Sequence, residues 1–192
     1  MAEAAPAGST RSWDRIARRL RVPLGFLFAV FYFWRAHPDW ISLALGMTVA
    51  AVGIFLRAMA SGHVQKNEQL ATTGPYAYCR NPLYLGSIII AVGFAIASRD
   101  VWVAVGIALL FVLIYVPVMR AEEMFLRERF AEYHSYARRV PRLLPRTFWF
   151  AGMTSGFSSE LYWQHREYNA LIGAAAMLAA LVVKLFWFPG SW

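Results

Sequence analysis

The chain has 192 residues, of which 59% are hydrophobic and only 16% charged, with a mean hydropathy of +0.43. Soluble domains carry about 25% charged and about 45–50% apolar residues, so the composition predicts an all-α integral membrane protein. The single cysteine, Cys79, excludes an intramolecular disulfide and a cysteine-rich metal site, and no metal is expected. The net charge of +8 comes from arginines beside apolar runs. Membrane lipids, through their anionic headgroups, are therefore the expected partner, and nucleic acid is not.

Several apolar runs along the chain approach the length of a membrane span, which needs about 20 residues. They predict about five transmembrane helices, at Val22–Trp34, Trp40–Ala60, Leu83–Ser98, Val101–Met119 and Asn169–Phe188.

This pattern divides the chain into three parts. Residues 1–21 form a basic segment, and its part Arg11–Arg21 fits either an interfacial helix or a plain cluster of topogenic charges. Residues 22–146 form the transmembrane core. Residues 147–192 form an interfacial linker and the last span.

The basic residues predict the orientation. Of the 19 Lys and Arg residues, all but Arg35, Arg99 and Lys184 fall on one side of the predicted spans. By the positive-inside rule, the N-terminus is cytoplasmic and the C-terminus is outside, as in a bacterial inner membrane.

Two polar clusters are predicted to meet at the cytoplasmic face. The third and fourth spans are joined by the short turn SRDVW, so they form an antiparallel hairpin. Two crossings return the chain to the side that it left. Arg80 and Asn81, before the hairpin, should therefore lie beside Glu122 and Glu123, after it.

The residue types in these clusters suit a charged ligand. Pro82 fits the first turn of a helix, so Arg80 and Asn81 should lie at a helix N-terminus, where an arginine can bind a carboxylate. Glu122 and Glu123 point about 100° apart, so one could bind hydroxyls while the other meets an ammonium group or Arg80. The alternative is that Arg80 is an ordinary membrane anchor and the glutamates an exposed helix start.

The segment after the glutamates, Met124–Pro145, carries aromatic residues at roughly helical spacing among charges. This pattern predicts one amphipathic helix at the interface, ended before Pro141. Such a helix could cover a cofactor pocket that faces the cytosol.

These pieces in this order resemble the isoprenylcysteine carboxyl methyltransferase family and its phospholipid N-methyltransferase relatives. The residues that carry the resemblance, from about Arg57 to Pro145, are His63, GPYAYCRNPLYLG, Glu122-Glu123 and FAEYHSYARRVPRLLP. Asn81 stands where the eukaryotic pattern has a histidine.

The resemblance implies an integral membrane methyltransferase that uses S-adenosylmethionine and a lipophilic acceptor from the bilayer. The cofactor-binding residues that it implies are His63, Leu70, Gly74, Tyr76, Arg80, Asn81, Tyr84, Glu122 and Glu123. Arg80 and Glu123 are the expected catalytic residues.

The acceptor stays open between a prenylated cysteine, a phospholipid amine and a small isoprenoid acid. An acceptor that needs no base, such as a carboxylate, is favoured because no strong base constellation is evident, although His63 or a glutamate could deprotonate an amine. Two other functions remain. An NADPH-dependent membrane reductase could use the arginines of Arg138–Arg146 for the 2′-phosphate, and a non-enzymatic scaffold would use neither cluster. The oligomeric state and the roles of the last span and of Ser158–Asn169, an interfacial linker or part of an acceptor gate, are left open.

Overall fold

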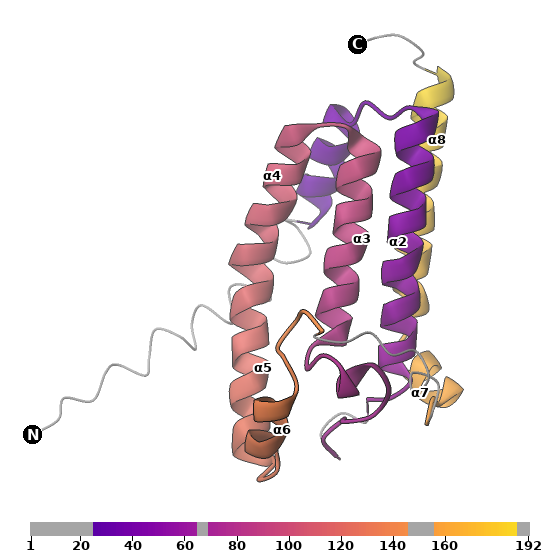
Figure 1. Ribbon diagram of the computed structural model, residues 1–192. Coiled ribbons are helices and arrows are strands. Elements are labelled where there is room, and N and C mark those ends of the chain that lie inside the picture. The colour runs from indigo at the N-terminus through magenta and orange to yellow at the C-terminus, as the bar shows by residue number, and fades with distance from the viewer. Residues whose placement is uncertain (1–24, 65–68, 146–155, 188–192) are drawn as a thin grey trace, which may run out of the picture.

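The computed structural model describes residues 25–64, 69–145 and 156–187, and every regular element within these ranges is a helix (Figure 1). The segment Arg11–Arg21, interpreted as either an interfacial helix or a cluster of topogenic charges, lies outside the described residues. In chain order the elements are the helix Gly25–Arg35, α2 (Trp40–Ser61), the short 3-10 helix η1 (Gly74–Ala77), α3 (Pro82–Ser98), α4 (Val101–Leu110), the π-helical stretch η2 (Phe111–Tyr115), α5 (Val116–Arg129), α6 (Tyr133–Arg139), α7 (Ser159–Gln164) and α8 (Tyr168–Trp187).

Three helices are long and apolar enough to cross a membrane: α2, the continuous helix Val101–Arg129 and α8. They confirm the second, fourth and fifth predicted spans, with two differences at their ends. The fourth continues to Arg129 instead of ending at Met119, and Phe188 lies outside the described residues. The architecture is that of an integral membrane protein, as the composition predicted.

The other two predicted spans correspond to shorter apolar helices, Gly25–Arg35 and α3. Helix α3 has 17 residues, so it is about 25 Å long against a hydrocarbon core of about 30 Å. The first predicted span began at Val22, which lies outside the described residues. The described part of this helix, Gly25–Arg35, is shorter than the roughly 20 residues that a full crossing needs.

Helices α2 and α3 lie side by side (Figure 1), and glycines of both helices lie in their contact. A Cβ atom added at Gly46 would lie 2.4 Å from the carbonyl oxygen of Gly93, and one added at Gly53 would lie 2.6 Å from that of Gly86. Small residues allow such close approach in membranes, where van der Waals packing replaces the hydrophobic effect between helices. This contact holds α3 closely against α2.

Helices α4 and α5 form one long rod, interrupted only by η2 (Figure 1). Pro117 lies in the first turn of α5. Proline has no N–H group and its ring clashes with the carbonyl four residues earlier, here Leu113 within η2. The π-helical stretch therefore accommodates the proline without ending the rod. The rod then carries Glu122 and Glu123 to the end of the bundle where α3 begins.

The prediction of one amphipathic helix from Met124 to before Pro141 is wrong in its continuity. Helix α5 runs through Met124 to Arg129, the chain becomes extended at Phe130 (φ −122°, ψ 115°), and α6 starts at Tyr133. The break turns aromatic side chains inward, because Phe130 and Tyr133 both line a cavity described below. The roughly helical spacing of the aromatic residues continues across the break, so the sequence pattern did not indicate it.

Polar contacts lock the opposite end of the bundle, at the α3–α4 turn. Arg35 forms a 2.6 Å ion pair with Asp100. The Lys184 ammonium donates to backbone carbonyls at the C-terminal end of the helix Gly25–Arg35, at 2.5–3.2 Å, where the helix dipole favours a cation. Arg35, Arg99 and Lys184, expected together on the sparsely charged side, all lie at this end.

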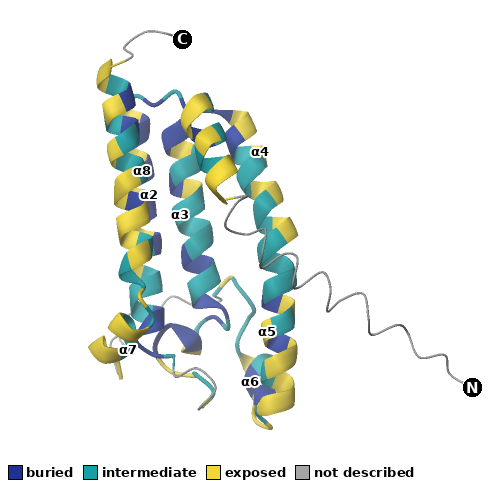
Figure 2. Cartoon of the chain, turned by 180° about the vertical axis from the view of Figure 1, so that it is seen from behind, coloured by how far each residue is buried: buried dark blue, intermediate teal, exposed yellow. Residues whose placement is uncertain are grey.

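The hydrophobic core lies at the same end and includes the fully buried Leu181 and Val103. Exposed residues cover the outer faces of α4 and α8, and buried ones face between helices (Figure 2). At the other end of the bundle, α6 and the segment before α3 lie beside the ends of α5 and α3 (Figure 1). Arg80 and Asn81 meet Glu123 there.

Candidate functional site

The η1 turn is shaped by one glycine and one buried histidine. Gly74 has a positive φ of 57°, and a Cβ atom added there would lie 2.4 Å from His63 Nε2. His63 is 7% exposed, and its Nδ1 lies 2.7 Å from the carbonyl oxygen of Met59. The histidine thus supports the turn from the end of α2, and glycine is needed for both conformation and space.

The turn delivers Arg80 and Asn81 to the start of α3. The backbone N–H of Arg80 donates to the carbonyl of Pro141 (2.9 Å). The Asn81 amide nitrogen donates to Glu123 Oε1 (3.2 Å) and to the carbonyl of Arg142 (3.1 Å). The chain after α6 therefore returns to cover this loop.

Glu123 is the buried hub of the cluster, with 8% exposure. Besides Asn81, its carboxylate meets Arg142 Nε at 3.1 Å and Arg80 Nη1 at 3.7 Å. The prediction that the hairpin brings Arg80 and Asn81 to the glutamate pair is confirmed. A buried carboxylate with one amide and two guanidinium partners is well compensated.

Tyrosines of α6 close the cluster. Tyr133 Oη accepts a 3.1 Å hydrogen bond from Arg80, and the Tyr136 hydroxyl donates to the carbonyl of Tyr76 at 2.7 Å. Burial raises the pKa of Tyr133, Tyr136 and Tyr76 above the ordinary value for tyrosine. They are therefore neutral hydroxyls at physiological pH, and they hold α6 against the η1 turn.

A cavity of about 240 Å³ opens beside this cluster. The expected site residues that line it are Leu70, Tyr76, Arg80, Asn81, Tyr84 and Glu122. His63, Gly74 and Glu123 are not part of the lining: the first two form the turn, and Glu123 holds Arg80 and Asn81 from behind.

The remaining walls are mostly aromatic and aliphatic: Val64, Gln69, Ala71, Leu83, Phe125, Leu126, Phe130, Tyr133 and Tyr136. Sequence reasoning treated the aromatic ones as the face of a covering helix and did not assign them to the site. It also missed Arg142 as a partner of Glu123. The one available signal for Arg142 was its place directly after the Val140-Pro141 pair in the matched segment.

The charges around the cavity favour a zwitterionic ligand. Arg80 lines the cavity and its side chain is 13% exposed, so a carboxylate that enters the cavity can meet its guanidinium. Glu122 lines the same cavity and is exposed. Tyr84 and Phe125 add flat apolar surface on which an aromatic ring can stack.

Cys79 adjoins the site but is not arranged as a nucleophile. It is 2% exposed, and its thiol lies 3.6 Å from the carbonyl of Arg142. Burial raises the pKa of the Cys79 thiol to about 11, so the reactive thiolate is scarce at neutral pH. Among the described residues there is also no group of three or more His, Cys, Asp or Glu placed to hold a metal ion.

Comparison with known proteins identifies the class. Residues 21–133 match the phospholipid methyltransferase family, so the chain belongs to that family. This agrees with the resemblance carried by the Arg80 and Glu122 motifs.

Two curated relatives are similar to this chain. The cobalt-zinc-cadmium resistance protein CzcN of Cupriavidus metallidurans is 35% identical over 161 residues, covering 77% of this chain and 74% of its own length. The nickel-cobalt-cadmium resistance protein NccN of Alcaligenes xylosoxydans xylosoxydans is 40% identical over 114 residues, covering 56% of this chain and 53% of its own length. No solved structure matches.

Proposed function

We propose that this protein transfers a methyl group from S-adenosylmethionine to a lipophilic acceptor at the cytosolic face of a bacterial inner membrane. The observation that carries the proposal is that Arg80 and Glu122 share one aromatic-lined cavity. A cofactor with a carboxylate, an ammonium group, ribose hydroxyls and an adenine ring is complementary to that set. Membership of the phospholipid methyltransferase family supports the same reaction class.

Each residue has a distinct role in this proposal. Arg80 binds the cofactor carboxylate, Glu122 takes the amino group or the ribose hydroxyls, and Tyr84 with Leu70 bounds the ring. Glu123 acts as a positioning residue through its contacts with Arg80 and Asn81. Its expected catalytic role is thereby revised to an indirect one.

The sulfonium of the cofactor supplies an already activated methyl group. The protein's own contribution is to align the reactants and to exclude water, which can contribute up to about 7–11 kcal/mol. Tyr133 and Tyr136 serve the second purpose, because they bind α6 over the cavity. The acceptor, an isoprenylcysteine-like carboxylate or another membrane lipid, arrives from the bilayer.

The NADPH-dependent reductase is the rival that the site favours less. A 2′-phosphate needs several basic groups at the pocket, but Arg138 and Arg139 are exposed on α6 and are not among the cavity-lining residues. Arg142, the third arginine of that segment, is engaged by Glu123.

Calorimetry of S-adenosylhomocysteine binding to the purified protein, with NADPH measured in parallel, tests the proposal. Removing a charged hydrogen bond costs about 1.5–3 kcal/mol, so Arg80→Ala and Glu122→Ala should each weaken binding about 10- to 100-fold. Glu128→Ala removes an exposed carboxylate of the same helix, outside the cavity lining, and should bind like the parent. Binding of NADPH without S-adenosylhomocysteine by folded protein would sink the methyltransferase proposal.

The names of the two relatives suggest a physiological setting. We propose that this protein contributes to resistance to divalent metals, and that it does so through methyl transfer. Expression in a metal-sensitive bacterium should then raise tolerance to cobalt. Glu122→Ala, expressed to the same level, should not, and equal protection by that variant would separate resistance from the reaction.

A further inference from the structure

A second and larger cavity, of about 450 Å³, lies within the apolar part of the bundle. Its volume falls in the range of ligand sites, roughly 300–1,000 Å³. It is lined from the helix Gly25–Arg35 and from α2, α3, α4, η2 and α8. Helix α8 follows the stretch that matches the family, residues 21–133, so this wall of the cavity lies outside the matched stretch.

The cavity is apolar at one end and polar at the other. Phe28, Phe94, Ile107 and Met177 line its apolar part. Arg57 near the end of α2, Ser87 in the second turn of α3 and Asn169 at the start of α8 line the polar part. The polar end therefore lies toward the end of the bundle that holds the first cavity.

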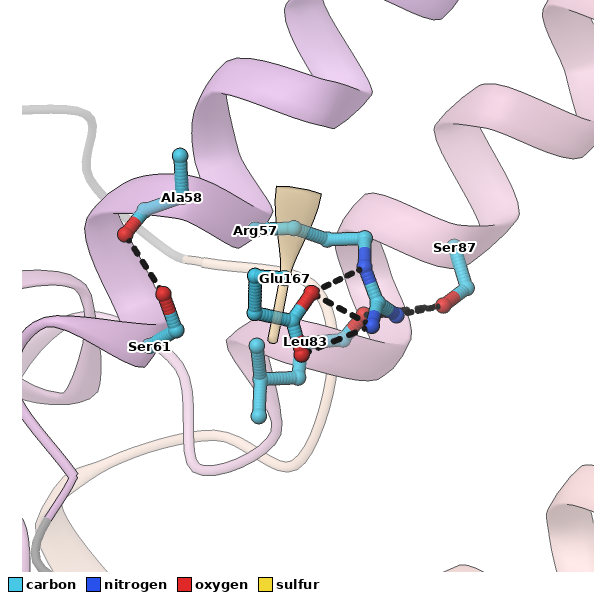
Figure 3. A network of polar contacts seen from close by, with 6 residues as sticks. All are labelled: Arg57, Ala58, Ser61, Leu83, Ser87 and Glu167. Atoms are coloured by element: carbon cyan, nitrogen blue, oxygen red, sulfur yellow. Dashed lines mark hydrogen bonds and ion pairs between the residues drawn. The ribbon is translucent and has the colours of Figure 1, made fainter. Parts of the chain in front are cut away.

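Arg57 is the one charged side chain among the described residues that line this cavity, and it is fully compensated (Figure 3). Glu167 pairs with its Nε and Nη2 at 2.7–3.1 Å, and its Nη1 donates to Ser87 (2.5 Å) and to the carbonyl of Leu83 (3.2 Å). A ligand carboxylate would compete with Glu167 for these donors, and a ligand cation would face Arg57. An uncharged headgroup meets neither penalty.

Asn169 gives such a headgroup a partner. It is exposed on α8 and lines the cavity, and its side-chain amide can both donate and accept hydrogen bonds. Gly173, one turn further along α8, is also exposed and lines the cavity. A Cβ atom added there would meet nothing within 4 Å, so the cavity opens toward the membrane along this edge of α8.

The linings of the two cavities meet at one pair of aromatic rings. Tyr84 lines the first cavity and Tyr115 the second, and their rings meet edge to face at 5.8 Å between centroids. A molecule in the second cavity thus has its polar end next to the proposed cofactor site.

We propose that this cavity binds the substrate lipid as a single-chain amphiphile, with its chain between α8 and α3 and an uncharged headgroup, an un-ionised amine, at Asn169 and Ser87. The lone pair of such an amine can take a methyl group without a base, and the methylated nitrogen then releases its proton to water. The inference rests on the proposed function for calling the ligand a substrate. It narrows the acceptor class, because it disfavours a carboxylate.

Photolabelling in nanodiscs tests the site, with a diazirine-bearing long-chain alcohol as the probe and peptide mapping as the readout. Labels should fall on Phe94, Ile107 and Met177, and dodecanol should compete them away. Laurate and dodecyltrimethylammonium, which carry the same chain with a charged head, should compete weakly. Competition by laurate equal to that by dodecanol would overturn the headgroup assignment.

Variants of α8 show whether the labelling arises in the cavity or on the outer surface of the helix. Gly173→Phe places a ring in open space, and displacing about two methylene groups of a bound chain should weaken labelling about tenfold. Ala175→Phe, at an exposed residue outside the lining, is the matched control. Asn169→Leu should weaken competition by dodecanol. Labelling that resists Gly173→Phe, or that falls on lipid-facing residues such as Leu109, would overturn the site.

The two proposals fail separately. S-adenosylhomocysteine binding by Gly173→Phe should match the parent, because Gly173 does not line the first cavity. Intact S-adenosylhomocysteine binding without specific lipid labelling would remove only this inference. Specific labelling without S-adenosylhomocysteine binding would leave a lipid site and remove the methyltransferase.

Discussion

The side-chain amide of Asn81 donates to Glu123 Oε1 across 3.2 Å, although 42 residues separate them in the chain. The same amide donates to the carbonyl of Arg142, so one side chain joins the start of α3, the rod α4–α5 and the segment after α6. The cluster depends on the neutral, donating character of this residue, because it faces two acceptors at once.

We expect Asn81→Asp to lower the free energy of unfolding by about 2–3 kcal/mol, since it removes a buried donor and sets a second carboxylate against Glu123. Sharing one proton between the two carboxylates relieves the repulsion, so the loss should shrink at acidic pH. Thermal unfolding in detergent across a pH series measures this. Gln164→Glu, the same chemical change at an exposed residue of α7, should leave stability unchanged.

Asn81→His tests the histidine found at this place in the eukaryotic pattern. An imidazole N–H can still donate to Glu123, so we expect a smaller loss of stability than for Asn81→Asp and retained S-adenosylhomocysteine binding. If histidine proves as damaging as aspartate, donation by Asn81 is not what holds the cluster.

Gly74→Ala should destabilise the η1 turn. A non-glycine residue at positive φ costs about 1–2 kcal/mol, and the added Cβ would also press on His63. Gly156 has a φ of 85° with nothing within 4 Å of an added Cβ, so Gly156→Ala isolates the conformational cost. Thermal unfolding should show a larger loss of stability for Gly74→Ala than for Gly156→Ala. Adding His63→Ala to Gly74→Ala removes the contact with the imidazole, so it should restore only the steric part of that loss.

The meeting of Arg80 and Asn81 with Glu123 followed from topology alone. Two spans joined by a short turn return the chain to one end of the bundle, whatever the details of packing. The apolar runs likewise located α2, α3 and α8 to within a residue or two at their starts.

The contacts that depend on helix rotation were beyond the sequence. Arg57 and Glu167 are 110 residues apart, and hydrophobic pattern alone does not decide which face of α8 turns toward α2. The break at Phe130 was missed for a related reason. Aromatic residues spaced for one helix serve equally well on the end of a long helix and on a second, short helix that follows it, as in α5 and α6.

Gly46→Leu should separate α2 from α3. The Cβ atom at this position would lie 2.4 Å from a backbone carbonyl that cannot move without its helix, and overpacking of this kind costs about 1–3 kcal/mol or more. Because α3 carries Arg80 and Asn81 to the site, S-adenosylhomocysteine affinity should fall together with the unfolding temperature. Gly173→Leu, the same change in an open position of α8, should affect neither. Equal losses in both variants would mean that the α2–α3 contact has no special role.

Deprotonation of the buried Cys79 thiol should lower the stability of the folded protein at alkaline pH. Its thiol pKa rises on folding from 9.0 to about 11 because the thiol is buried. The folded state therefore holds the proton more tightly, and its contribution to stability is complete below pH 9 and is lost as pH rises toward 11. At pH 8 the native thiol should resist iodoacetamide, while protein unfolded in dodecyl sulfate should react, as mass spectrometry will show.

The buried tyrosines Tyr76 and Tyr136 change stability in the same direction, so the Cys79→Ala variant is needed to separate the contribution of the thiol. That variant should lose less stability than the parent between pH 9 and pH 11, and an identical decline in both would show that the thiol stays protonated or exposed in both states.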